Sequence, residues 1–426
     1  MRALHLILIP LSLMTSALAG AGETPLGFDQ ALNQIMARST QIGAQREAYE
    51  SLESANLPTR LFYLPTISTN AKVSYNGDPS SVRLRTARHA EVQADLNIFR
   101  FGADYTQLRA AQNDEAQQKE VLSSTILQTE DQAVQALIEA IRTGFELDVL
   151  RRQVKVREEA LQIAQKRYER GFLAEQEVRK VLIDVSNAQS RLAQGELSSI
   201  EANSTLRSLL GPDPIAIQWP WKTALTSAKA DELTKRFKFD LKDRPDWAAA
   251  QARLTANEYR RTHNYLLMLP SLDASITYGY YKYDFDAGAP NGPAWQGAFV
   301  VTLPIFDRLV NLSNGRAQAH LVRQAAFQQT EVERNADAQV SAAKQSLLRA
   351  VTSAAERDTT LSKSMNLYQD SLRRFQNGRA DTNEMLLDQT RVLDTELLAI
   401  SGWSEAHLAL ARFCHSLGKR VAECLR

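Results

Sequence analysis

The stretch LPSLDASITYGY, residues 269–280, alternates strictly between apolar and polar side chains. If the chain is extended there, one face carries the apolar residues Leu272, Ala274, Ile276, Tyr278 and Tyr280. The opposite face carries Ser271, Asp273, Ser275, Thr277 and Gly279. A period of two residues predicts a β-strand with one apolar and one polar face.

A second copy of this strand lies 205 residues earlier in the chain. It begins at Leu64-Pro65, as the first begins at Leu269-Pro270, and it alternates as far as Tyr75. Each copy is followed by a cluster of turn-forming residues, at 76–81 and 284–293, and then by another alternating stretch, at 90–98 and 295–303. Alternating stretches joined by turn formers predict two β-hairpins.

Beyond the hairpins, matching residues recur at an offset of 207. The pairs are Leu96 with Leu303, Ile98 with Ile305, Arg109 with Arg316, Arg167 with Arg374, Gly171 with Gly378, and Gly211 with Gly418. Agreement at this many points indicates that the chain is internally duplicated.

Two long stretches contain no proline, from residue 80 to 211 and from residue 305 to the end. Their composition and the 3,4 spacing of their apolar residues predict long helices over 101–170 and 311–377 that pack as coiled coils. Each helix would be a rod of roughly 100 Å at 1.5 Å per residue. Because glycines follow both helices, we expect a tight turn and a shorter returning helix after each.

These patterns predict the organisation of the chain. An apolar N-terminus ending in Ala17-Leu18-Ala19 favours a secretory signal peptide at 1–19, with a membrane anchor as the alternative. A first repeat of helix (27–59), hairpin, long helix and returning helix follows, then a linker, a second repeat and a short tail. Their predicted bounds are 20–211, 212–244, 245–418 and 419–426.

The bulk composition excludes several classes of function. With 50 basic and 49 acidic residues, the chain has a net charge of +1 and no field that favours nucleic acid. The six histidines are scattered, and no catalytic grouping or phosphate-binding glycine loop is recognisable. We therefore expect neither an enzyme nor a bound metal or other cofactor.

The two cysteines, Cys414 and Cys424, are both near the C-terminus. On one straight helix they would lie about 15 Å apart, too far for a disulfide. A disulfide therefore requires the chain to turn back, for which Gly418 is the natural position. The sequence leaves open whether the bond forms.

The four predicted strands have the length of membrane-spanning barrel strands, but four strands cannot close a barrel. If the sheet lies in a membrane, the chain must oligomerise, and three copies would give 12 strands around a water-filled lumen. Apolar residues would then meet lipid, while Lys72, Glu91, Asp95 and Asp273 would line water. The alternative is a soluble sheet packed on helices, which long rods do not favour.

At this level the chain resembles the TolC family of outer-membrane efflux and secretion channels over essentially its whole mature length. The motifs that carry the resemblance are Arg244-Pro245-Asp246, Leu64-Pro65, Leu269-Pro270, Leu303-Pro304-Ile305-Phe306, Arg167-Tyr168 through Gly171, and Arg374-Phe375 through Gly378. Their order and duplication are more specific than any single motif.

The resemblance implies a mainly helical fold with a small β part. It implies a homotrimer whose 12-stranded barrel lies in outer-membrane lipid and continues into a coiled-coil tunnel across the periplasm. Such a channel is a passive exit duct of a tripartite efflux pump or a type I secretion system. A periplasmic adaptor opens it and links it to an inner-membrane pump or ABC transporter.

The resemblance also assigns roles to two turns. Gly171-Phe172-Leu173 and Gly378-Arg379-Ala380 correspond to the tunnel tip that contacts the adaptor, although each glycine can also be only a helix cap. The sixth residue after each glycine is acidic, Glu177 and Glu384.

Three copies of these carboxylates would form rings that favour cations at the tunnel constriction. The family's second constriction aspartate is replaced by Leu387, with Asp388 following it. Solvated helix carboxylates are the alternative reading of these acids. For the whole chain, the alternative function is a secreted or periplasmic coiled-coil scaffold without transport activity.

Overall fold

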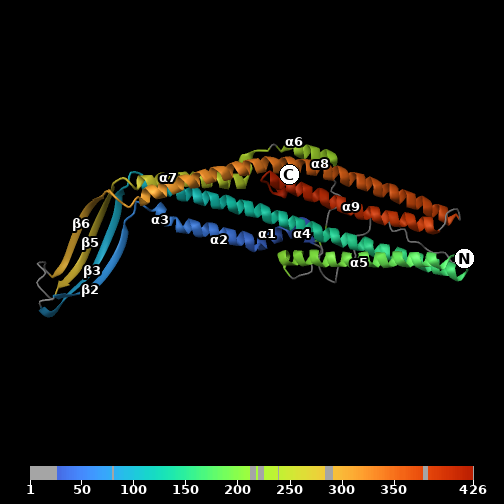
Figure 1. Cartoon of the computed structure of the whole chain (residues 1–426), viewed down its shortest axis with the longest axis horizontal. Helices are drawn as coiled ribbons and strands as arrows, with labels where there is room; N and C mark the ends of the chain where they lie inside the picture. The colour runs from blue at the N-terminus through green and yellow to red at the C-terminus, as the bar shows by residue number, and fades with distance from the viewer. Residues whose placement is uncertain are drawn as a thin grey trace. The chain divides into compact units, whose positions relative to one another are not determined.

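The computed structural model describes residues 26–78, 81–211, 217–218, 225–237, 239–283, 291–377 and 382–425 (Figure 1). The predicted signal peptide at 1–19 lies outside these residues. The chain divides into two compact units. Unit 1 comprises Met1–Gly43, Ser124–Arg244 and Ala336–Arg426, and unit 2 comprises Ala44–Ser123 and Pro245–Asn335.

Unit 2 contains a four-stranded antiparallel sheet in the order β2-β3-β5-β6 (Figure 1). Its strands are β2 (Thr66–Asp78), β3 (Ser81–Phe99), β5 (Ser271–Tyr283) and β6 (Gly292–Thr302). The predicted hairpins are thus confirmed, and β3 pairs with β5 to join them. The loop expected from residue 76 is shorter than predicted, because backbone pairing of β2 with β3 continues beyond the alternating side chains.

The two faces of the sheet differ as the alternation predicted. On the apolar face Ile276 is 58% exposed and Phe299 is 78% exposed, so no other part of the described chain covers them. On the polar face, side chains bond to one another across strands: Asn97 donates to Asp273 (2.5 Å) and Tyr281 donates to Glu91 (2.9 Å). Side chains are therefore paired across the polar face, whereas the described residues leave the apolar face without a partner.

Unit 2 also has a helical part. It contains most of α2 (Thr40–Ala55), α3 (Leu57–Arg60), α7 (Pro245–Leu266) and one end each of α4 and α8. Polar contacts join the helices: Trp247 Nε1 donates to Glu333 (3.0 Å), and Arg260 forms an ion pair with Asp114. His263 Nδ1 lies 2.8 Å from the Ala103 carbonyl oxygen at the start of α4.

The two long helices are α4 (Ala103–Glu169) and α8 (Val310–Gln376), each of 67 residues. The first observed helix ends one residue from its predicted end at 170, and the second ends one residue from 377. The returning helices are α5 (Glu175–Leu210) and α9 (Thr382–Ser416). Proline-free sequence with apolar residues at 3,4 spacing was therefore sufficient to predict all four helices.

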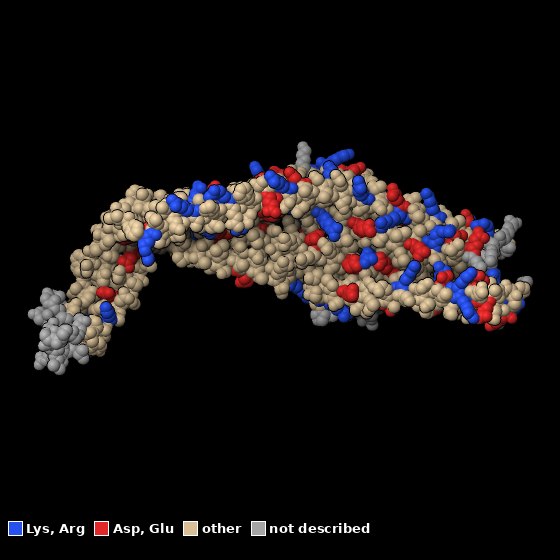
Figure 2. Space-filling view, in the orientation of Figure 1, with Lys and Arg blue, Asp and Glu red and all other residues tan. Residues whose placement is uncertain are grey.

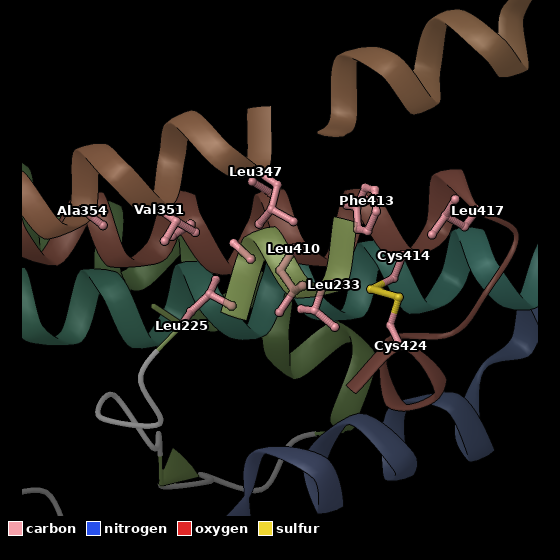
Figure 3. Packing of buried hydrophobic residues seen from close by; sticks show 13 residues of the cluster. Leu225, Leu233, Leu347, Val351, Ala354, Leu410, Phe413, Cys414, Leu417 and Cys424 are labelled. Atoms are coloured by element: carbon pink, nitrogen blue, oxygen red, sulfur yellow. A yellow bond between two sulfur atoms is a disulfide. The ribbon is translucent and has the colours of Figure 1, made fainter. Parts of the chain in front are cut away.

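In unit 1 these helices share three apolar clusters. The first contains Leu347 of α8, Phe413 of α9 and both cysteines, together with Leu233 of α6 (Ser227–Arg236) (Figure 3). The second joins α1 (Phe28–Arg38) to α4 and α5, and the third joins α4 to α9. Each cluster draws on helices far apart in sequence, so the core is distributed along the helices.

The first predicted helix is broken in the structure. One helix was expected over 27–59, but Ser39 has an extended backbone (φ −61°, ψ 114°) and separates α1 from α2. The Ser39 hydroxyl accepts a hydrogen bond from the Ile42 backbone N–H (3.3 Å), as a helix N-cap does. Pro58 sits in the first turn of α3, where its missing N–H costs nothing.

The segment between the repeats carries smaller elements. The two-residue strands β1 (Leu26–Gly27) and β4 (Ile217–Gln218) pair in parallel. A 3₁₀ turn at Leu241–Asp243 precedes α7. The next residue, Arg244, is buried, and its guanidinium donates to the Ser416 carbonyl oxygen (2.9 Å) and to Gln339 (3.0 Å).

The C-terminal segment turns back at Gly418, which has φ +75°. The turn brings α10 (Val421–Leu425) against α9, and Cys414 and Cys424 form a disulfide with their Cα atoms 5.9 Å apart. Both cysteines are fully buried in the first cluster (Figure 3). The question that the sequence left open is therefore answered by the turn.

We predict that Gly418→Ala destabilises the protein by about 1–3 kcal/mol, because an alanine strains at this φ. Its Cβ would also lie 2.6 Å from the Asp243 carbonyl oxygen. Gly43→Ala is the matched control, because nothing lies within 4 Å of its Cβ position in α2. The control should gain about 0.5–1 kcal/mol from helix propensity. Equal unfolding free energies for both variants, measured by denaturant titration, would contradict this role of the turn.

Candidate functional site

The turn between α4 and α5 has the backbone geometry that its sequence predicts. Gly171 has φ +74°, and its N–H donates to the Tyr168 carbonyl oxygen (2.9 Å). The Phe172 N–H donates to the Arg167 carbonyl oxygen (2.9 Å). These two bonds form a Schellman motif, in which the left-handed residue is normally glycine because a Cβ there is strained.

This turn exposes a large apolar side chain. Phe172 is 78% exposed, while Leu173 is half-buried. An exposed phenylalanine next to a rigid turn is a suitable anchor for another protein, since aromatic residues dominate the energetics of interfaces. The corresponding residues of the second repeat, Gly378, Arg379 and Ala380, lie outside the described residues.

Two of the three predicted constriction acids link α9 to α8. Glu384 forms an ion pair with Arg374 of α8 (2.9 Å), and both side chains are about half exposed. Asp388 is only 5% exposed; it accepts a hydrogen bond from the Ser371 hydroxyl and pairs with Arg391 (2.6 Å). Asp388 is therefore not a freely solvated carboxylate.

The third acid has a different environment. Glu177 is exposed in the first turn of α5 and pairs with Lys180 on the same helix (2.7 Å). Acidic residues in the first turn also interact favourably with the helix dipole. Within one chain, Glu177 thus has a local structural role, whereas Glu384 and Asp388 connect two helices.

Ser371 and Arg391 belong to this polar link, but the sequence did not single them out. Ser371 is fully buried, and Ser364 is buried one heptad before it. Two serines at heptad spacing in an apolar seam are a signal that polar partners lie opposite. The partner itself could not be predicted, because it depends on the register of α8 against α9.

A second group of charged residues lies where the C-terminal segment meets α4. Glu130 of α4 is fully buried, and its carboxylate is 3.5 Å from His415 Nε2 and 3.4 Å from Arg420 Nε. His415 Nδ1 is 3.3 Å from the Asp131 carboxylate. A buried carboxylate requires such partners, because an unpaired buried charge costs several kcal/mol.

The two carboxylates change the titration of His415. Burial alone lowers its pKa, but hydrogen bonding and attraction to Asp131 and Glu130 outweigh burial and raise the pKa above the ordinary 6.5. The protonated imidazolium therefore fits this site better than the neutral ring. The pKa of His407, which lies about two turns earlier on α9, is shifted in the opposite direction. Burial lowers it, and the contact of the ring with the Trp403 carbonyl oxygen offsets this only in part.

No group of three or more His, Cys, Asp or Glu side chains among the described residues is arranged to hold a metal ion. No helix in the same residues is both long enough and apolar enough to cross a membrane.

The sequence profile described as "Outer membrane efflux protein" matches residues 31–212. No curated sequence matches the chain significantly. Solved structures match it over nearly its whole length. The Campylobacter jejuni CmeC outer membrane channel aligns with a TM-score of 0.78 at 13% identity, over 93% of this chain and 88% of that chain.

Two further structures give similar values. The open state of the Neisseria gonorrhoeae MtrE outer membrane channel has a TM-score of 0.75 at 17% identity, covering 92% of this chain and 89% of that chain. The Vibrio cholerae outer membrane protein VceC has a TM-score of 0.76 at 14% identity, covering 92% of this chain and 96% of that one. At these identities, structural similarity establishes the fold alone.

The fold is thus that of the outer-membrane channel proteins, mainly helical with four antiparallel strands per chain. The first repeat, residues 31–212, matches the outer membrane efflux protein family, the TolC-like channels that the motifs indicated. This family consists of channels, not enzymes, located in the outer membrane and extending into the periplasm. This match and the channel-like fold argue against the alternative of a soluble scaffold.

We predict that the His415 site stabilises the fold in a pH-dependent way. Because the folded-state pKa is raised, the stabilisation is fully present below the unfolded-state pKa and is lost as pH rises through the folded-state pKa. His415→Gln keeps a hydrogen-bond donor but cannot titrate. The difference in melting temperature between wild type and variant should therefore shrink as pH rises from about 5 to 8. A difference that does not change with pH would contradict the assignment.

Proposed function

We propose that this protein is the outer-membrane exit duct of a tripartite efflux pump or type I secretion system. The observation that carries the proposal is the state of the sheet. In the described chain β2 pairs only with β3 and β6 pairs only with β5, so both edges are open. An open edge in lipid leaves backbone groups unsatisfied at several kcal/mol each.

A trimer would remove both open edges of the sheet. Pairing β6 of one copy with β2 of the next closes a barrel of 12 strands, large enough for a water-filled lumen. The exposed apolar face then meets outer-membrane lipid, and the hydrogen-bonded polar face lines the lumen. The long helices of three copies would form the periplasmic tunnel.

The tunnel tip is the proposed site for the periplasmic adaptor, which connects the duct to an inner-membrane pump or ABC transporter. Gly171, Phe172 and Leu173 supply a rigid turn and an exposed aromatic side chain. Gly378, Arg379 and Ala380 are proposed as its counterpart on sequence grounds. Which transporter and which cargo use the duct depends on the adaptor.

The tunnel constriction is proposed to involve Glu177, Glu384 and Asp388. Repeated in three copies, exposed carboxylates there would favour cations. Glu384 is held by Arg374 and Asp388 by Ser371, so these contacts between α8 and α9 stabilise the arrangement found in the single chain. Opening of the tip would have to exchange or loosen them.

We predict that Ile276→Arg blocks assembly in the membrane. A lipid-facing arginine near the middle of a barrel strand costs about 2–4 kcal/mol, and three copies multiply the cost. Thr277→Arg is the matched control on the polar face. Heat-modifiable trimers in the outer-membrane fraction should disappear for the first variant and persist for the second. Loss of trimers in the Thr277 variant alone would show that the faces are assigned the wrong way round.

We predict that large side chains at the tip uncouple the duct from its adaptor. The double variant Gly171→Trp, Gly378→Trp should lose transport while trimers remain in the membrane. The control is Gly144→Ala in α4, where nothing lies within 4 Å of the Cβ position. The measurement is the export rate in cells that carry the cognate adaptor and pump. Wild-type export by the double variant would refute the role of the turns.

A further inference from the structure

The register of the strands orders the outer face of the sheet into rows. Each row contains side chains that lie opposite one another on neighbouring strands. Successive rows contain Leu272 and Val301; Leu96, Ala274 and Phe299; Ile67, Ala94, Ile276 and Gly297; Thr69, Val92, Tyr278 and Trp295; and Ala71, Ala90, Tyr280 and Pro293. None of these rows contains a charge.

The next row is different. It contains Val73 of β2, Arg88 of β3 and Lys282 of β5, with Arg88 directly opposite Lys282. Both cations are exposed. Like charges directly opposite each other destabilise a sheet, so the pair requires an anion to be favourable.

The described chain supplies no such anion. Neither Arg88 nor Lys282 forms an ion pair within that part of the chain. At the other end of the same strands, by contrast, Arg100 is balanced by Asp104 (3.7 Å) and Asp273 (3.6 Å). Charged side chains are also sparse over the strands compared with the helices (Figure 2). The cationic pair is therefore an exception on this surface.

The position of the cationic pair along the strands indicates which part of the membrane it faces. The chain enters α4 directly after Phe99, and β5 follows α7, so the Leu272 row is at the helical, periplasmic end of the strands. Arg88 and Lys282 lie at the opposite end, directly beyond the aromatic residues Tyr278, Tyr280 and Trp295. Tyr and Trp mark the boundary between hydrocarbon and water in membrane barrels.

From Leu272 to Lys282 the strand rises about 33 Å, which at a tilt of about 40° is about 25 Å along the barrel axis. This is comparable to the apolar band of about 25 Å that faces lipid in such barrels. The cationic row therefore lies at the headgroup level of the outer leaflet. In the outer membrane this leaflet is built from a phosphorylated glycolipid.

We propose that Arg88 and Lys282 form a lipid-binding site for the phosphate groups of outer-leaflet glycolipids. The inference rests on the outer-membrane location. Arginine binds phosphate with two parallel hydrogen bonds, and lysine adds a point charge beside it. A trimer would carry three such sites around the barrel and hold annular lipid against the protein where its sheet meets the external surface.

The test uses the purified full-length protein and diphosphoryl lipid A in detergent micelles, with fluorescence-detected binding. Wild type should bind lipid A more tightly than Arg88→Gln, Lys282→Gln by about thirtyfold, and each single variant should lose about fivefold. Lys72→Gln is the matched control, because Lys72 lies on the opposite face of β2 in the neighbouring register position. The control should bind as wild type does. Wild-type affinity in the double variant, or an equal loss in the Lys72 control, overturns the proposal.

Further measurements distinguish lipid phosphate from free phosphate, and failure of the lipid site from failure of the channel function. Fully dephosphorylated lipid A should bind wild type no better than it binds the double variant. Inorganic phosphate at millimolar concentration should not displace lipid A, and full displacement would assign the site to free phosphate instead. Conductance of wild-type trimers in planar bilayers without lipid A tests the channel function separately.

Discussion

The unpaired edges of β2 and β6 are the constraint on which the rest of this structure depends. Water can satisfy exposed backbone N–H and C=O groups, but hydrocarbon cannot. A four-stranded sheet with an apolar outer face is therefore incomplete as a single chain in a membrane. In the proposed trimer, closure by other copies would satisfy the edges and cover no apolar residue that should meet lipid. It would enclose the face on which Asn97 bonds to Asp273 and Tyr281 to Glu91.

The helices, unlike the sheet, do not depend on pairing with another chain for their backbone hydrogen bonds. Helices of 67 residues satisfy their own backbones, so their stability depends on side chains packed along their whole length. The three apolar clusters of unit 1 supply this packing, and buried polar links fix which helices are neighbours. The disulfide and the charges around Glu130 then hold the C-terminal segment to the helices. The polar link of Asp388 with Ser371 lies instead near the end of α8, at the proposed tunnel constriction.

The sequence predicted the fold because each element has a simple period. Alternation gave the strands, and long intervals without proline gave the helices to within a few residues of their ends. The break at Ser39 was missed because the apolar spacing continues across it, and only one residue departs from helical geometry. The extent of β3 was missed because backbone pairing does not depend on alternation.

In the candidate sites, too, local features could be predicted from the sequence and contacts between distant helices could not. The turn at Gly171 could be predicted, since a left-handed residue after a helix is a local property of the chain. The burial of Asp388, the partner of Glu384 and the cluster at Glu130 and His415 depend on how distant helices pack, which no local pattern encodes. The disulfide depended on the turn at Gly418. Contact with an adaptor and the constriction remain proposals.

The mass of the protein extracted from the outer membrane in mild detergent tests the central claim most directly. Native mass spectrometry should give a complex of three chains, because three copies of four strands close the barrel. A monomer that remains folded in the membrane extract, or a complex of two chains, would contradict the account, since neither leaves a closed sheet with a water-filled lumen.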